Sequence, residues 1–165
     1  MRDRALFDLA IDSKLRGRDL AQMKIRDIVS GGQTRTRAIV MQQKTGRPVQ
    51  FEPLPDARTS LLARLERRGG TVDDYVFSSR VDRNGHVSTR QYARLVDEWV
   101  KGVGLMRSES GMHSLRRTKV SIIYRATGNF RAIQILLGHS KIENTVRCLD
   151  IDVEDALALA ENTES

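Results

Sequence analysis

Leu136-Leu137-Gly138-His139-Ser140, followed by Lys141-Ile142-Glu143, is the stretch that decides how this chain folds. The leucines close a helical pattern that starts at Asn129, and Gly138 ends it because glycine adopts the left-handed conformation of a helix C-cap. Ser140 and Glu143 have the spacing of a capping box, which predicts that another helix starts there. His139 therefore lies between two helices, next to a helix N-terminus that favours anions.

A second basic motif lies upstream of this stretch. His113 and Arg116 are three residues apart, so both side chains project from one side of a helix that we expect over His113 to Ala126. Both imidazoles are thus predicted at helix starts, where a phosphate group is favoured.

The rest of the pattern predicts a mainly α fold with a small antiparallel β-sheet (α+β). Two β-prone runs flank Lys44-Thr45-Gly46 and predict a hairpin with a basic tip. The third strand is expected either around Ile25–Ile28 or at Tyr75–Phe77. The other expected elements are helices from Arg2 to Asp12, from Leu15 (capped by Ser13) to Ile28, from Pro55 to Gly69-Gly70, from the cap Ser88, and from Val153 to Ala160.

Length and composition suit a single domain over residues 1–165, with 39% apolar and 30% charged residues. The single cysteine excludes an internal disulfide and a CxxC zinc motif. No signal peptide or spanning run is present, so we expect a cytoplasmic protein that has no membrane partner.

The charge predicts a polyanionic partner. The net charge is +7 and the pI is about 10.1, and arginine supplies most of the positive charge. Aromatic residues make up only 5% of the chain, too few for reading single strands by stacking. Double-stranded DNA held by its backbone is therefore the expected partner.

Five motifs in this order resemble the boxes of the tyrosine recombinase, or phage integrase, catalytic domain. They cover the chain from about Arg4 to Asp155. They are Leu15-Arg16-Gly17-Arg18-Asp19-Leu20, Gln43-Lys44-Thr45-Gly46-Arg47-Pro48, His113-Ser114-Leu115-Arg116-Arg117-Thr118, Leu136-Leu137-Gly138-His139-Ser140 and Asn144-Thr145-Val146-Arg147-Cys148-Leu149.

This resemblance implies the fold of the DNA breaking-rejoining enzymes and site-specific cleavage and rejoining of DNA through a 3′-phosphotyrosine intermediate. Arg16 and Arg116 would clamp the phosphate oxygens, and Lys44 would protonate the departing 5′ oxygen. His113 would help to deprotonate the nucleophile, and His139 would bond a phosphate oxygen. Neither a metal nor another cofactor is needed, because fixed cations stabilise the charge.

Further residues take supporting roles by the same resemblance. Asp19 would orient the basic side chains. DNA-backbone contacts or plain solvation are expected for Arg18, Arg47, Arg117, Lys119 and Arg147. The family's N-terminal core-binding domain is expected to be absent, and the segment after Val153 to contact another protomer in a homo-oligomer on DNA or to fold back on its own domain.

Cys148 departs from the family pattern, because it stands where the nucleophilic tyrosine is expected. Its side chain is shorter by a whole ring, so its sulfur should not reach phosphorus. Whether the chain is an enzyme thus stays open: we predict impaired cleavage, and the alternative is a catalytically inactive DNA-binding or regulatory relative. Less favoured readings are a type IB topoisomerase and a metal site of His113, His139 and Cys148 with Asp150.

Overall fold

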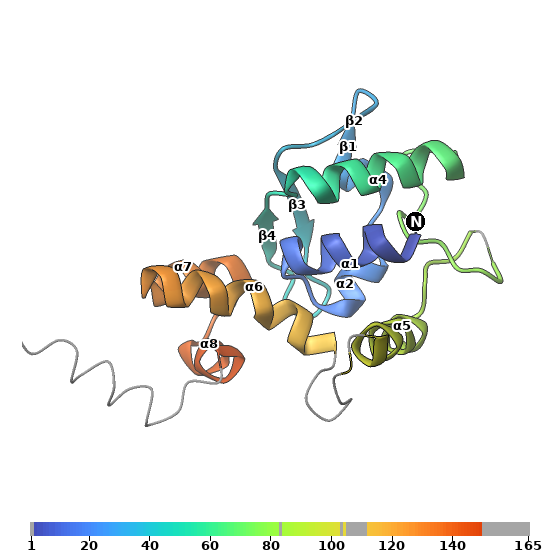
Figure 1. Cartoon of the computed structure of the whole chain (residues 1–165). Helices are drawn as coiled ribbons and strands as arrows, with labels where there is room; N and C mark the ends of the chain where they lie inside the picture. The colour runs from blue at the N-terminus through green and yellow to red at the C-terminus, as the bar shows by residue number, and fades with distance from the viewer. Residues whose placement is uncertain (1, 83, 103, 105–111, 150–165) are drawn as a thin grey trace, which may run out of the picture.

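The chain reverses direction at Lys14, directly after its first helix. The computed structural model describes residues 2–82, 84–102, 104 and 112–149, without the side chains of Met112 and His113. Helix α1 (Arg2–Ser13) confirms the expected first helix. Lys14 then has a φ of 55°, and the Leu15 N–H donates to Ser13 Oγ at 3.3 Å. This turn places the next residues beneath α1 (Figure 1).

The continuous helix predicted from Leu15 to Ile28 is wrong. Two short helices replace it, α2 (Gly17–Ala21) and α3 (Ile25–Ile28). The break falls where Lys24 forms an isolated bridge with Tyr75, so its backbone pairs across the fold rather than along a helix. Neither site proposed for a third strand joins the hairpin sheet.

The predicted hairpin is confirmed. Strands β3 (Ala38–Met41) and β4 (Pro48–Phe51) are antiparallel, with Ala38 opposite Phe51 and Met41 opposite Pro48. Burial alternates along both strands, because successive side chains point to opposite faces. A second, separate pair joins β1 (Val29–Ser30) to β2 (Gln33–Thr34).

The predicted helices of the remaining chain are present, with one shifted start. They are α4 (Pro55–Arg68), α5 (Thr89–Gly102), α6 (Met112–Thr127), α7 (Phe130–Leu137) and α8 (Ile142–Leu149). Ser88 caps α5, since its Oγ accepts the Gln91 N–H at 3.1 Å. The capping box at Ser140 is wrong, because α8 begins at Ile142, which makes Lys141 the preceding residue. The helix expected over Val153 to Ala160 lies outside the described residues.

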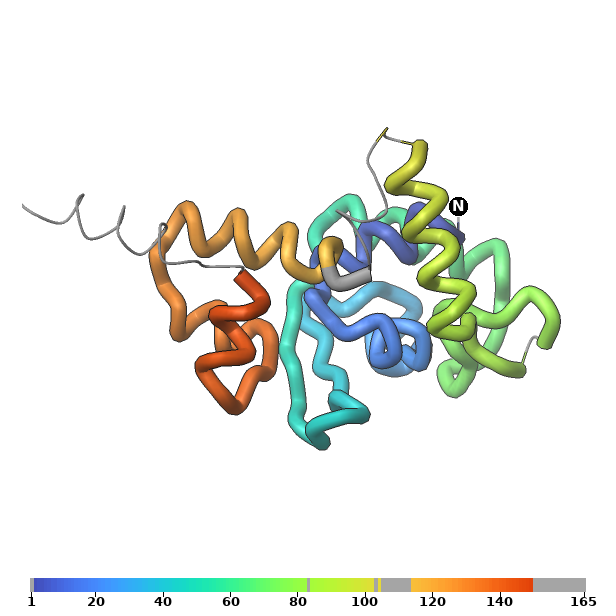
Figure 2. The backbone as a smooth tube through the Cα atoms, turned by 90° about the horizontal axis from the view of Figure 1, so that it is seen from below, coloured from blue at the N-terminus to red at the C-terminus, as the bar shows by residue number. Residues whose placement is uncertain are grey.

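Apolar side chains gather in two clusters of unequal size. The larger unites α1, α2, the β3–β4 hairpin, α4 and α5 around Leu6, Leu9, Leu20 and Phe77. The smaller lies between α6, α7 and α8 and is built on Val120, Ile133 and Leu137. Figure 1 shows α6, α7 and α8 as a lobe beside the main body, and Figure 2 shows the loop between β3 and β4 projecting next to that lobe. The predicted site residues meet at this junction.

Candidate phosphate-binding site

Arg16 is held by an amide from the hairpin. It is the N-cap residue of α2, and its Nη1 donates to Gln42 Oε1 at 2.8 Å. Gln42 is 1% exposed, and its Nε2 donates to the Leu137 carbonyl at 3.2 Å. One buried side chain therefore ties the first arginine to the end of α7.

Arg116 reaches the same carbonyl from α6. Its Nη2 donates to Leu137 O at 2.9 Å and lies 3.3 Å from His139 Nε2. Arg116 is 7% exposed, and burial, followed by the nearby Arg16, lowers its pKa to about 10. Arg16 and Arg116 are thus brought together, as the sequence predicted, at one turn of backbone.

His139 is oriented from both sides of its ring. A guanidinium only donates, so Nε2 accepts from Arg116, and the proton is on Nδ1, which donates to Thr145 Oγ1 at 3.1 Å. Burial, with smaller contributions from Arg116 and Arg16, lowers the pKa of His139 to about 4. The imidazole is therefore neutral at pH 7. The positive charges of Arg116 and Arg16 oppose protonation of the imidazole, and the negative charge of a bound phosphate would offset them.

Gly138 permits the close approach of α7 to the hairpin. Its φ is 64°, the left-handed conformation expected for it, and the amide of His139 donates to Gln134 O at 3.0 Å. A Cβ at Gly138 would lie 2.6 Å from Val49 Cγ2 and 3.2 Å from Gln42 Nε2. A larger residue here would push the hairpin away from Leu137 and separate the two arginines.

Lys44 lies at the exposed tip of the hairpin loop. The loop is closed by Gly46 N–H donating to Gln42 O at 2.8 Å and by Gln42 N–H donating to Arg47 O at 2.9 Å. Lys44 has no polar partner among the described residues, so it can turn toward a bound anion. Asp19, 3% exposed, accepts the Gln43 N–H at 2.9 Å. It therefore positions the start of the Lys44 loop rather than bonding the arginines.

Cys148 lies on α8 within the smaller apolar cluster and is half-buried. Burial raises the pKa of its thiol above the ordinary value, although Arg116, Arg117 and Arg16 act in the opposite direction. Cys148 is therefore close to the arginine pair but protonated at neutral pH, and a thiol is a weak nucleophile in that form.

The remaining predicted site residues differ in how exposed they are and in whether they have a partner within the fold. His113 lies in the first turn of α6, as expected, but its side chain lies outside the described residues. Arg18, Arg47 and Arg147 are exposed and Arg117 is half-buried, whereas Lys119 donates from α6 to buried Asp12 at 2.5 Å. Arg47 lines a cavity of about 360 Å³ together with His139 and Ser140. Lys119 is thus engaged within the fold instead of with solvent.

Sequence reasoning missed Gln42 and Thr145, which hold Arg16 and His139. Gln42 continues the inward register of Ala38 and Val40, and a polar residue at an inward position signals a buried hydrogen-bonding role. Thr145 is fully buried and lies three residues before Cys148 on α8, so both belong to the helix face that meets the site.

Two guanidiniums and a neutral imidazole converge here beside a half-buried residue of α8. Gln42 and Leu137 O fix the two guanidiniums in advance, and Thr145 fixes the imidazole ring, which suits stabilisation of a negatively charged phosphate by the guanidiniums. Among the described residues, no group of three or more His, Cys, Asp or Glu could hold a metal ion. The metal site predicted as an alternative includes the His113 side chain and Asp150, which lie outside those residues. The arrangement of these basic side chains suits the binding of a phosphate group.

Residues 1–154 match the model of the phage integrase family, and this chain belongs to that family. It is 30% identical over 158 residues to tyrosine recombinase XerC of Pelobacter propionicus, an alignment that covers 93% of this chain and 49% of the relative. It is 29% identical over 147 residues to tyrosine recombinase XerC of Xanthomonas axonopodis, covering 88% and 45%. The chain thus spans about half the length of the curated relatives it matches.

Solved structures show the same fold. The chain superposes on XerA recombinase with a TM-score of 0.79 at 20% identity, covering 99% of this chain and 57% of that one. It superposes on XerH site-specific recombinase bound to a palindromic difH substrate with a TM-score of 0.78 at 18% identity, covering 96% and 44%. The predicted fold, a mainly helical tyrosine recombinase catalytic domain with small antiparallel sheets, is confirmed.

Proposed function

We propose that this chain binds double-stranded DNA and holds one backbone phosphate in the cradle formed by Arg16, Arg116 and His139. The observation that supports this most is the shared anchor: both guanidiniums are fixed at the end of α7 through Leu137 O, one directly and one through Gln42. Arg16, Arg116 and His139, which come from three motifs far apart in the sequence, therefore meet in one basic cradle. The relatives and solved structures named above are recombinases, and we propose the same class of reaction, DNA strand cleavage and rejoining, for this chain.

The proposed reaction is transesterification at phosphorus. With a tyrosine at position 148, its oxygen would attack the phosphate while His113 takes the phenol proton. Arg16 and Arg116 would bind the non-bridging oxygens, and the bond to the 5′ oxygen would break. Lys44, on its exposed loop, would give that oxygen a proton. The bond energy would be kept in a covalent protein–DNA link, so later attack by the 5′ hydroxyl would rejoin the strand.

In this chain we propose that the reaction is impaired at its first step. Cys148 is half-buried and its thiol stays protonated, and its side chain lacks the length of a tyrosine ring. A catalytically inactive DNA-binding relative is the second candidate, favoured by this same residue. Residues 1–165 would then act as one domain, and any homo-oligomer would form on DNA.

Covalent trapping separates the two candidates. A pool of nicked duplexes with a randomised core is incubated with the chain and with Cys148→Tyr, and adducts are detected by denaturing gel and mass spectrometry. We expect adducts from Cys148→Tyr and none from the chain as it stands. Adducts through Cys148 would refute the proposed impairment. DNA binding without adducts in Cys148→Tyr would favour the inactive relative, and absence of duplex binding in both would refute the proposed function.

The described residues contain no helix that is both long and apolar enough to pass through a bilayer.

A further inference from the structure

A second concentration of arginines lies at the other end of α1 from the cradle. Arg2 begins α1, and Arg64, Arg67 and Arg68 occupy the last two turns of α4. With Arg80 they line a cavity of about 490 Å³ that also includes Ser78, Ser79 and Asn84. Figure 1 shows the N-terminal end of α1 beside the C-terminal end of α4, on the side of the body away from the α6–α8 lobe.

The helix C-terminus explains only part of this cluster. Cations are favoured at the end of a helix, and that accounts for Arg67 and Arg68. Arg2 and Arg80 come from other elements, so the fold gathers them there for another reason. α1 is 12 residues long, so its two ends, Arg2 at the cavity and Ser13 on the side of the cradle, are about 16 Å apart along the helix axis.

The positive charge of the cavity exceeds the negative charge that the fold supplies. Arg2 Nε pairs with Asp3 at 3.1 Å, and Arg68 Nη1 lies 4.0 Å from Asp74. Arg80 Nη2 lies 4.0 Å from the same Asp3. Among the described residues, five guanidiniums therefore line the cavity, and two carboxylates, Asp3 and Asp74, form ion pairs with three of them.

Three buried guanidinium nitrogens of the cavity arginines lack a hydrogen bond among the described residues. They are Arg2 Nη2, Arg64 Nε and Arg68 Nη1, and each is inaccessible to water. Burial lowers the pKa of Arg64, and the repulsion by Arg2 and Arg68 adds to the effect. Arranging like charges this way costs stability unless an anion balances them.

Gly70 and Ser78 let the Arg68 guanidinium lie close to the backbone at the wall of the cavity. Gly70 has a φ of 118°, and a Cβ there would lie 2.6 Å from Asp74 Oδ2 and 3.2 Å from Arg68 Nη1. Ser78 Oγ accepts from Arg68 Nε at 3.2 Å, which aligns that guanidinium across the cavity. Arginine, serine and glycine residues thus form most of the cavity wall, together with Asn84 and the Asp74 carboxylate.

We propose that the cavity between Arg2, Arg64 and Arg68 is a second binding site for a phosphate group, separate from the cradle at Arg16 and Arg116. A guanidinium fork matches phosphate oxygens with two parallel hydrogen bonds, and several forks converge here. The phosphate is either a small free ligand or part of a DNA strand. Phosphate binding here does not depend on the recombinase activity proposed above.

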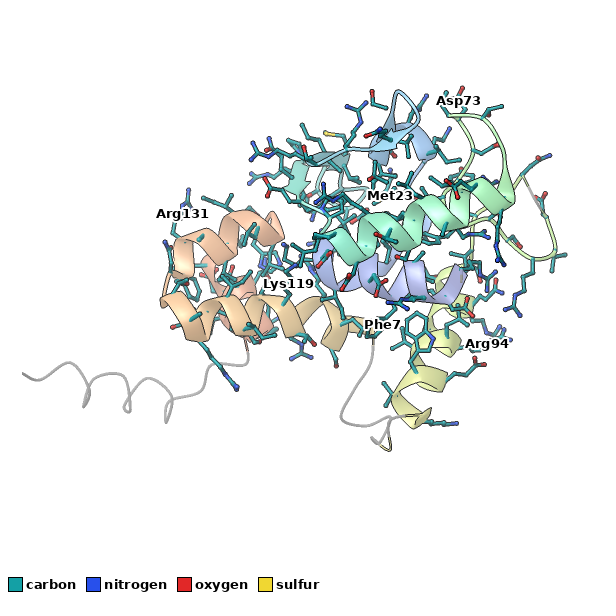
Figure 3. All side chains as sticks on the ribbon, turned by 45° about the horizontal axis from the view of Figure 1, so that its top comes forward. Phe7, Met23, Asp73, Arg94, Lys119 and Arg131 are labelled. Carbon is teal, nitrogen blue, oxygen red and sulfur yellow. The ribbon has the colours of Figure 1, made fainter. Side chains whose placement is uncertain are left out.

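Calorimetric titration of the full chain with inorganic pyrophosphate tests the site. The background is Arg16→Gln/Lys44→Gln, which weakens the cradle at two residues that reach solvent. In it, Arg64→Gln/Arg68→Gln is compared with Arg94→Gln/Arg125→Gln, which removes the same charge from two exposed positions on α5 and α6. Arg94 is labelled in Figure 3. We expect at least tenfold weaker binding for the cavity variant alone, and equal binding by both would overturn the proposal.

Arg64→Gln by itself covers the case in which the double variant fails to fold. Arg64 has no hydrogen bond or ion pair to lose among the described residues, so this variant should fold normally and still weaken pyrophosphate binding severalfold. Unchanged binding by a folded Arg64→Gln variant would also count against the site.

Duplex DNA then distinguishes the two sources of phosphate. If the phosphate belongs to DNA, log affinity against log salt should become shallower by about one in the cavity variant relative to the charge-matched control. If it is a small free ligand, the two variants should bind duplex equally while their pyrophosphate affinities still differ.

Discussion

The cradle and the arginine cavity are both basic, yet their cations are held in opposite ways. In the cradle, Arg16, Arg116 and His139 each have a fixed neighbour, and two of them share the end of α7. Among the described residues, the buried guanidinium nitrogens that have no hydrogen bond number three in the cavity and one, Arg116 Nε, in the cradle. The comparison shows that directed hydrogen bonds fix the orientation of the cradle side chains. The arginines of the cavity instead produce a strongly positive electrostatic potential.

A cradle arginine should therefore have the largest effect. In the Cys148→Tyr background, Arg116→Ala should lower covalent adduct formation by about 100- to 1000-fold, because one preorganised donor to the phosphate is lost. The free energy of unfolding should also fall by about 1–3 kcal/mol, since Leu137 O loses a buried donor. Trapping rates and urea denaturation measure the two effects. Adduct formation at an undiminished rate would show that the cradle does not act on the phosphate.

Gln42→Leu should have the next largest effect. It removes the acceptor for Arg16 and a donor to Leu137 O, so the free energy of unfolding should fall by about 1–3 kcal/mol. Adduct formation in the Cys148→Tyr background should fall as well, because Arg16 is no longer fixed. The control is Gln50→Leu on the exposed face of β4, which should leave both unchanged. Equal effects of the two substitutions would refute the role of Gln42 as an anchor.

His139 makes the cradle sensitive to pH. Its pKa is about 4 in the folded chain, against 6.5 ordinarily, so the unfolded state binds the proton more tightly. Stability should thus be lost as pH falls from about 6.5 to 4, by about 1–2 kcal/mol after allowance for solvent screening. Denaturation midpoints of the chain and of His139→Asn, compared across this range, test it. The His139→Asn variant should show a flatter pH dependence of stability than the unchanged chain.

The cavity should give the smallest effect on stability. Arg64→Gln should change the free energy of unfolding by less than about 0.5 kcal/mol or raise it, because repulsion from Arg2 and Arg68 is relieved. Thermal denaturation at low phosphate measures this. A large loss of stability would mean that Arg64 is a structural residue, which would remove the contrast with the cradle.

Local patterns predicted the elements well where one residue determines them. Asn129 caps α7 by accepting the Ala132 N–H at 2.9 Å, and Gly138 ends it in the left-handed conformation. The alternation in the hairpin followed from the two-residue period of strands. One failure lies where distant chain intervenes, because Lys24 bridges to Tyr75. The other is local, because α8 starts at Ile142 instead of after a cap at Ser140.

The sequence predicted which residues form the candidate site, but it did not predict the hydrogen bonds and ion pairs that hold them. The order of the motifs pointed to Arg16, Arg116 and His139, because each residue type suits a phosphate. The sequence could not show that Asp19 bonds the hairpin backbone, or that Lys119 pairs with Asp12. Both contacts join residues far apart in the chain, so no local pattern reports them.

The amino-acid sequence alone determined the helical and hairpin elements, the basic character of the chain and the replacement at Cys148, since these depend on single residues and short spacings. The tertiary structure decided that the apolar side chains form two clusters, that Gln42 of the hairpin bonds Leu137 of the smaller one, and that five arginines gather near the end of α4. Such features require side chains distant in sequence to pack together, and packing is a property of the whole fold.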